Sequence, residues 1–314
     1  MSALLGEIGR KLADVWFTLL VLPGALYLAV ATAAYRLGHA RPFDIGALAG
    51  DVTTFAAGPA ARSAGGQALL LVAALAVAAI AGLAAQGLGS LLERIVLAAD
   101  WRAWYGPLFW LADRRVARRR KRWQARAAIY HRLREDAALA RARGGRPDSS
   151  PRRAAGHAMN RVAVEEPDRP TWTGDRVHAV AVRLERDHQL DLAVVWPHLW
   201  LTLPDPVRAE ITAARQSLAR ATTLGGWAIL YALLTVWWWP AGLLAVVLAG
   251  TARHRTRGTV DVYARLLEAA TRLHAGELAR RLGLEHDGPL TPEVGDALTR
   301  LLHSEPPMPA AIDR

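Results

Sequence analysis

Cysteine is absent from this chain of 314 residues, and lysine occurs only at Lys11 and Lys121. Without thiols there is no disulfide, no cysteine nucleophile and no thiolate metal ligand. The sequence also lacks a Gly-rich phosphate loop, a dinucleotide-binding glycine pattern and the serine elbow of hydrolases. His178, His188 and His198 recur every ten residues, a spacing that does not place ligands on one helix face. We therefore predict no metal site, no cofactor and no catalytic residue, and the sequence favours a protein that is not an enzyme.

Apolar and basic residues are segregated along the chain. Hydrophobic residues make up 52% of the sequence, yet the net charge is +11. The apolar residues form long blocks and the charges fill the gaps between them, which is typical of a multi-pass membrane protein. We therefore predict an all-α, polytopic protein of the plasma membrane, with two transmembrane hairpins and a basic helical cytoplasmic insert.

The uncharged stretch at residues 224–252 has three consecutive tryptophans and Pro240 at its middle. Tryptophan concentrates at membrane interfaces, and proline interrupts a helix. Basic residues flank both ends, and the positive-inside rule places both flanks in the cytoplasm. We expect a hairpin of two spans that turns at residues 237–240; a single tilted span and a re-entrant loop are the alternatives.

The remaining topology follows from the same rules, with four spans and both termini in the cytoplasm. Residues 1–14 are the expected cytoplasmic N-terminus, 15–37 the first span, 38–66 an external loop and 67–92 the second span. Residues 93–217 are the basic cytoplasmic region, with a disordered linker at about 144–169. The third and fourth spans are 218–239 and 240–257, followed by cytoplasmic helices at 258–303 and a disordered tail at 304–314.

Small residues recur every four positions in the second span, at Ala74, Ala78 and Gly82. This spacing lets helix backbones approach closely in a membrane. We predict that these residues pack against another helix. The alternative is a substrate path along this face, although the spans carry none of the ionisable residues typical of proton-coupled carriers.

A long basic helix is expected at residues 107–143, directly after the second span. Its most cationic part consists of Arg114, Arg115, Arg118, Arg119, Arg120, Lys121 and Arg122. Basic runs beside a membrane contact anionic lipid headgroups, and basic runs elsewhere bind nucleic acid. The adjoining span favours anionic lipid of the bilayer over nucleic acid.

Residues 190–203 are apolar but too short to span a bilayer comfortably. We expect Pro197 to divide them, and the segment to be buried or interfacial. Trp196, Pro197 and Trp200 then either pack on neighbouring helices or form a docking surface for a cytoplasmic protein partner.

The sequence from Pro170 onward resembles a family of uncharacterised multi-pass bacterial membrane proteins that is frequent in actinobacteria. The similar positions include Pro170-Thr171, Gly174, Arg183, Leu190-Asp191, Trp196-Pro197, Leu199-Trp200 and Leu203-Pro204. The family commonly has Asn where this chain has Asp175, and usually Arg where it has His198. The resemblance covers roughly the last 145 residues. It implies a membrane protein in which the Trp-Pro-x-Leu-Trp segment is a shared structural feature, and it implies no activity.

These observations favour a membrane anchor, scaffold or effector subunit that binds a cytoplasmic partner and anionic lipid. An oligomeric pore or transport component, assembled from several copies of the chain, is the alternative. A membrane enzyme acting on lipids is a weaker one.

Overall fold

The computed structural model describes residues 21–286 and 288–303, and the described chain is entirely α-helical apart from turns and one short 3-10 helix. The all-α prediction is therefore confirmed for these residues. The expected N-terminal segment 1–14, the first part of the expected first span and the expected tail 304–314 lie outside the described residues.

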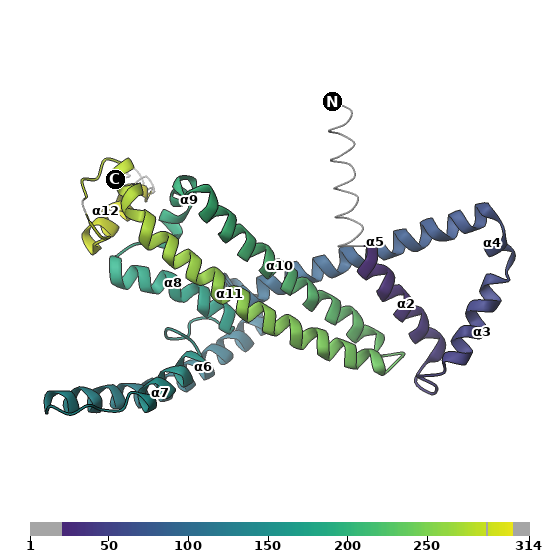
Figure 1. Cartoon of the computed structure of the whole chain (residues 1–314), viewed down its shortest axis with the longest axis horizontal. Coiled ribbons are helices and arrows are strands. Elements are labelled where there is room, and N and C mark those ends of the chain that lie inside the picture. The colour runs from purple at the N-terminus through teal and green to yellow at the C-terminus, as the bar shows by residue number, and fades with distance from the viewer. Residues whose placement is uncertain (1–20, 287, 304–314) are drawn as a thin grey trace, which may run out of the picture. The chain divides into compact units, whose positions relative to one another are not determined.

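Twelve elements follow one another along the described chain (Figure 1). They are α2 (Leu22–Leu37), α3 (Ile45–Ala56), α4 (Pro59–Arg62), α5 (Ala64–Leu97), η2 (Trp101–Ala103), α6 (Gly106–Ala142), α7 (Ser150–Asn160), α8 (Trp172–His188), α9 (Leu192–Thr202), α10 (Asp205–Leu234), α11 (Pro240–Arg281) and α12 (Pro292–Leu302). They form two compact units. Unit 1 contains residues 1–93 and 218–256, and unit 2 contains residues 94–217 and 257–314.

Unit 1 has small residues inside and large apolar residues outside. Its interior is made mostly of alanine and glycine, together with Trp227, Tyr231 and Leu234. Large aliphatic residues on the same helices are exposed, among them Leu22, Leu26, Leu69, Leu71, Val72, Leu83, Leu243, Val246 and Val247. The core of unit 2 differs, because it is built mainly from large aliphatic residues such as Val180, Leu184, Leu199 and Leu267.

Residues 224–252 fold as a helical hairpin within unit 1. Helix α10 ends at Leu234 and α11 begins at Pro240, with the three tryptophans in the turn. A Cβ added to Gly242 would lie 3.3 Å from the Thr235 side chain, and one added to Gly225 would lie 3.9 Å from Ala252. The two arms are therefore packed antiparallel.

Among the residues that the structure describes, α5 is the one helix that is long enough and apolar enough to cross a bilayer. Helix α2 covers only 16 residues. Helices α10 and α11 each join an apolar stretch to a strongly charged one.

Residues 38–66 are not the loop expected from their glycine and proline content, because they form α3 and α4. Many of them are alanine, the strongest helix former, and Pro59 occupies the first position of α4, where proline is favoured. The turn that precedes α3 is held to the hairpin by Trp238, whose Nε1 donates to the carbonyl of Pro42 at 2.9 Å.

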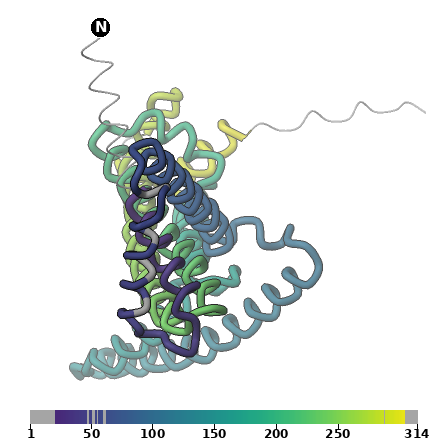
Figure 2. The backbone as a smooth tube through the Cα atoms, turned by 90° about the vertical axis from the view of Figure 1, so that its right-hand side faces the viewer, coloured from purple at the N-terminus to yellow at the C-terminus, as the bar shows by residue number. Residues whose placement is uncertain are grey.

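The expected disordered linker at 144–169 is also wrong, because it contains α7, which lies along α6 (Figure 2). Arg126 of α6 donates to the carbonyl of Ala158 at 2.8 Å, and a Cβ on Gly156 would meet the ring of Tyr130 at 3.4 Å. The order comes from these long-range contacts, which the Gly, Pro and Ser content of the segment does not reveal.

Pro197 does not divide its segment, since α9 runs through it without interruption. The side chain of Asp191 caps the helix by accepting from the N–H of Ala193 at 2.8 Å. Proline inside a helix costs about 3 kcal/mol. Burial of Val195 and Leu199 in the core of unit 2 offsets this cost.

Candidate functional site

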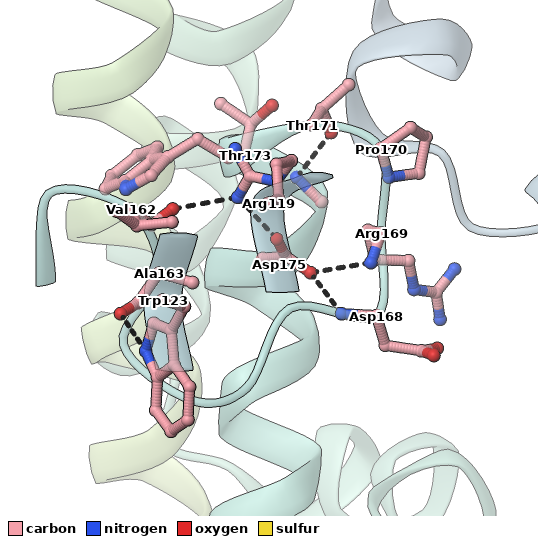
Figure 3. A network of polar contacts seen from close by, with 12 residues as sticks. Arg119, Trp123, Val162, Ala163, Asp168, Arg169, Pro170, Thr171, Thr173 and Asp175 are labelled. Atoms are coloured by element: carbon pink, nitrogen blue, oxygen red, sulfur yellow. Dashed lines mark hydrogen bonds and ion pairs between the residues drawn. The ribbon is translucent and has the colours of Figure 1, made fainter. Parts of the chain in front are cut away.

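A buried polar network joins α6, α8 and the loop between α7 and α8 within unit 2 (Figure 3). Its centre is Asp175 in the first turn of α8, where a carboxylate also faces the positive end of the helix dipole. Thr171 caps this helix by accepting from the N–H of Gly174 at 3.0 Å. Sequence and capping thus place the carboxylate at a helix start inside the protein.

Asp175 is 4% exposed and all its contacts come from elsewhere in unit 2. One carboxylate oxygen lies 2.5 Å from Nη2 of Arg119 on α6. The other accepts from the backbone N–H groups of Asp168 at 2.9 Å and Arg169 at 2.7 Å. Burial raises the pKa of the Asp175 carboxyl, and the charge and hydrogen bonds of Arg119 oppose this effect. Both oxygens are engaged, so the geometry suits a structural role rather than proton transfer.

The same loop is bound to α6 through its backbone carbonyls. Arg119 donates to the carbonyl of Val162 at 2.8 Å, and Nε1 of Trp123 donates to that of Ala163 at 3.0 Å. Arg115 donates to the carbonyl of Pro170 at 2.8 Å. Three residues of α6 thereby hold both ends of the loop.

The loop and the first turn of α8 also cap the C-terminal end of α5, in the part of that helix that belongs to unit 2. The last carbonyls of a helix have no partner within the helix. Here Thr173 donates to the carbonyl of Val96 at 2.8 Å, as Thr171 also does. Arg169 donates to the carbonyl of Ala98 at 2.7 Å. The network therefore fastens the end of α5 to α6 and α8.

A ladder of charged contacts joins α8 to α11 in unit 2. Its ion pairs are Arg176–Asp261 at 2.7 Å, Arg183–Glu268 at 2.7 Å and Asp187–Arg272 at 3.0 Å. The partners in every pair are 85 residues apart. A further rung with the same separation is Arg257, which lies 4.5 Å from the ring centre of Trp172. A constant separation means that the two helices run parallel in one fixed register.

The ladder was not predicted above, although its signal is present in the sequence. Charged residues occur on α8 with spacings of seven and four, and residues of opposite charge occur on α11 with the same two spacings. Two matched patterns of this kind on separate helices indicate a pair in register.

The histidines do not form a metal site in the described residues, where no group of three potential ligands is present. His178 lies near the network, with Nε2 3.9 Å from a carboxylate oxygen of Asp168. Its pKa is lowered, first by burial and then by the charge of Arg169. A neutral imidazole is therefore favoured at this position.

The predicted basic run splits into two groups in the structure. Arg119 is 15% exposed and faces Asp175, Arg115 binds Pro170, and Arg120 pairs with Glu166 at 3.1 Å. The others, Arg114, Arg118, Lys121 and Arg122, have exposed side chains. The structure thus assigns part of the run to contacts within unit 2.

Trp196 and Trp200 both pack against the core of unit 2, with ring centres 5.8 Å apart. Each ring is half-buried, whereas Pro197 is exposed on the other side of α9. The structure brings the two tryptophans together and leaves one edge of the pair open to solvent.

The small residues of α5 are divided as well. Ala78 and Gly82 are buried together with Ala85 and Gly89, whereas Ala74 is exposed. A Cβ on Gly89 would lie 2.7 Å from Cα of Thr223 on α10. This side of α5 is therefore occupied by other helices of unit 1, in close packing of the kind that the spacing predicts. The packed residues extend from Ala78 to Gly89 and do not include Ala74.

A scan against protein-family models, a search of curated proteins and a search of solved structures each found no match to this chain.

Proposed function

We propose that this chain is an integral protein of the plasma membrane that acts by binding, as an anchor, scaffold or effector subunit. In this proposal unit 1 is embedded in lipid, with four spans and both termini in the cytoplasm. Unit 2 is the cytoplasmic body. The resemblance to the bacterial multi-pass family belongs to the same proposal.

The observation that carries the proposal is the burial pattern of unit 1. Large aliphatic side chains face outward while alanine and glycine fill the contacts between helices. Such a surface is costly in water and suits lipid, where close packing of small residues holds helices together. Only 22% of the most apolar window of α5 is buried inside the protein. Most of that window is therefore available to hydrocarbon.

A pore along the small-residue side of α5 is less well supported. That side is filled by Gly24, Thr223 and Gly226 of neighbouring helices. A binding role for unit 2 is favoured by the half-buried tryptophan pair of α9, which offers an aromatic edge to a cytoplasmic protein partner. The fully engaged carboxylate of Asp175 favours a structural role for the network over catalysis.

Single-cysteine labelling tests the topology, because the chain has no cysteine of its own. Ala57→Cys and Val236→Cys should react with an impermeant maleimide in intact cells, and Ser150→Cys should react only after permeabilisation. Alkaline extraction should leave all three variants in the membrane fraction. Labelling of Ser150→Cys in intact cells, or release of the protein by alkali, would refute the proposal.

A further inference from the structure

The first turns of α6 expose a concentration of apolar side chains within unit 2. Tyr105 is 89% exposed, Leu108 59%, and Trp110 and Leu111 56% each. The backbone beneath them is fixed, because the buried ring of Trp101 stacks on Phe109 with ring centres 5.8 Å apart. Ala98, Ala112 and Val116 complete the packing under this segment. The exposed side chains therefore belong to a rigid surface, which we call the α6 foot (residues 105–111).

A cationic stripe continues from the foot along the outer side of the same helix. Its members are the exposed residues Arg114, Arg118, Lys121 and Arg122. They lie opposite the inward-facing line of Ala112 and Val116, which are buried, and Arg119 and Trp123, which are partly buried, as a helical period of 3.6 requires. No acidic residue occurs between positions 114 and 134. Arg114 lies 5.1 Å from the ring centre of Trp110, so the stripe begins at the foot.

We propose that the α6 foot inserts into the headgroup region of an anionic bilayer, and that the cationic stripe binds the lipid phosphates beside it. This inference rests on the proposed membrane function and names the lipid contact of unit 2. Tryptophan and tyrosine prefer the interface between hydrocarbon and water, and clustered arginine and lysine are attracted to anionic lipid. An apolar foot favours a bilayer over nucleic acid, whose backbone contacts are polar and charged.

The position of the foot in the chain gives a second reason for a bilayer. Helix α5, the candidate span, ends at Leu97, and α6 begins at Gly106. The end of α5 is clasped by Thr171, Thr173 and Arg169. Only residues 98–105 separate the two helices, so the foot directly follows the candidate span along the chain.

Depth-dependent quenching of a fluorescent label tests the inference on the full chain in liposomes. Single cysteines at Leu111, Ile129 and Leu83 would each carry a polarity-sensitive dye, with spin-labelled phospholipids as quenchers. Ile129 is a matched control, because it lies on the same side of α6 as Leu111 about 27 Å further along the helix. Leu83 is an exposed residue of α5 and reports whether unit 1 is in lipid.

We expect the label at Leu83 to be quenched in phosphatidylcholine and in its mixtures with phosphatidylglycerol. The label at Leu111 should be quenched by shallow quenchers, increasingly as phosphatidylglycerol is added, and the label at Ile129 should not. When R114E and R118E are introduced together, the phosphatidylglycerol content required to quench the label at Leu111 should rise at least about five-fold. R132E and R134E, equal charge changes farther along α6, should leave it unchanged.

The outcomes separate the inference from the function on which it rests. Quenching at Leu83 without quenching at Leu111 would overturn the foot and leave the membrane assignment intact. Absence of quenching at Leu83 would overturn both. Quenching at Leu111 that ignores phosphatidylglycerol would overturn the role of the cationic stripe. Nucleic acid that copurifies with the protein and is lost in R114E and R118E would assign the stripe to nucleic acid instead.

Discussion

Replacing Arg119 by methionine tests whether the buried ion pair with Asp175 is central to the stability of unit 2. Methionine keeps most of the length of the side chain and removes its charge. The carboxylate of Asp175, 4% exposed, would keep two backbone donors and lose the cationic partner that lies 2.5 Å away, Arg119. Breaking a buried pair in this way costs about 3–5 kcal/mol. For a unit of this size that corresponds to a fall in Tm of about 6–20 °C.

The matched control is Arg120→Met on the same helix. Arg120 pairs with Glu166, and both side chains are nearly half exposed. Exposed pairs contribute about 0–1 kcal/mol, so we expect a fall in Tm of at most about 4 °C. The assay is thermal unfolding of the purified full chain in detergent. Unfolding is monitored by the change in tryptophan fluorescence as the tryptophan side chains become exposed.

The double variant Arg119→Met with Asp175→Asn completes the cycle. Removing both charges should recover about 0.5–3 kcal/mol relative to the sum of the single changes. Equal Tm values for Arg119→Met and Arg120→Met, or strict additivity in the cycle, would refute the assignment of Arg119 and Asp175 as a coupled buried pair.

Three further predictions concern helix packing, the ladder and pH. Gly89→Ala should lower the Tm of the chain, because its Cβ would lie 2.7 Å from Thr223, whereas Gly87→Ala meets nothing within 4 Å and should be neutral or slightly stabilising. Arg183→Glu should lower the free energy of unfolding, and the double variant Arg183→Glu with Glu268→Arg should restore much of it. If urea unfolding shows no recovery in the double variant, the ion pair between Arg183 and Glu268 is contradicted. Burial lowers the pKa of His178 in the folded protein below its ordinary value of 6.5. As the pH falls below 6.5, the unfolded chain therefore binds a proton at His178 more readily than the folded chain, and Tm should fall. His178→Gln should flatten the profile of Tm against pH between 7 and 5, and an unchanged slope would count against this source of pH dependence.

Local signals in the sequence predicted helix positions well. The expected helix at 107–143 is α6, and α10 begins at Asp205, at an Asp-Pro pair of the kind that favours a helix start. Thr291 precedes α12 in the same manner. These signals depend on residues within one turn of the helix end, and single-sequence reasoning can read them directly.

Features that depend on distant contacts were not predictable in the same way. Helix α7 is held by Arg126 and Tyr130, and nothing in its own composition indicates that contact. Asp175 was not a candidate residue, because only the fold brings Arg119 within reach of it. The basic run illustrates the same limit, since burial on one side of α6 separates Arg119 from the exposed Arg118.

The fixed separation of 85 residues between α8 and α11 also governs which motions these helices can make. If α8 slid by one turn in one direction, Arg176 and Arg183 would face Arg265 and Arg272. In the other direction, Arg176 would face Arg257, and Asp187 would face Glu268. Either step replaces attraction by repulsion at two rungs, which disfavours the one-turn shift by which helices in other proteins switch between states. Motion of these two helices is therefore expected as bending or rotation of the α8–α11 pair as a whole, and not as sliding of one helix past the other.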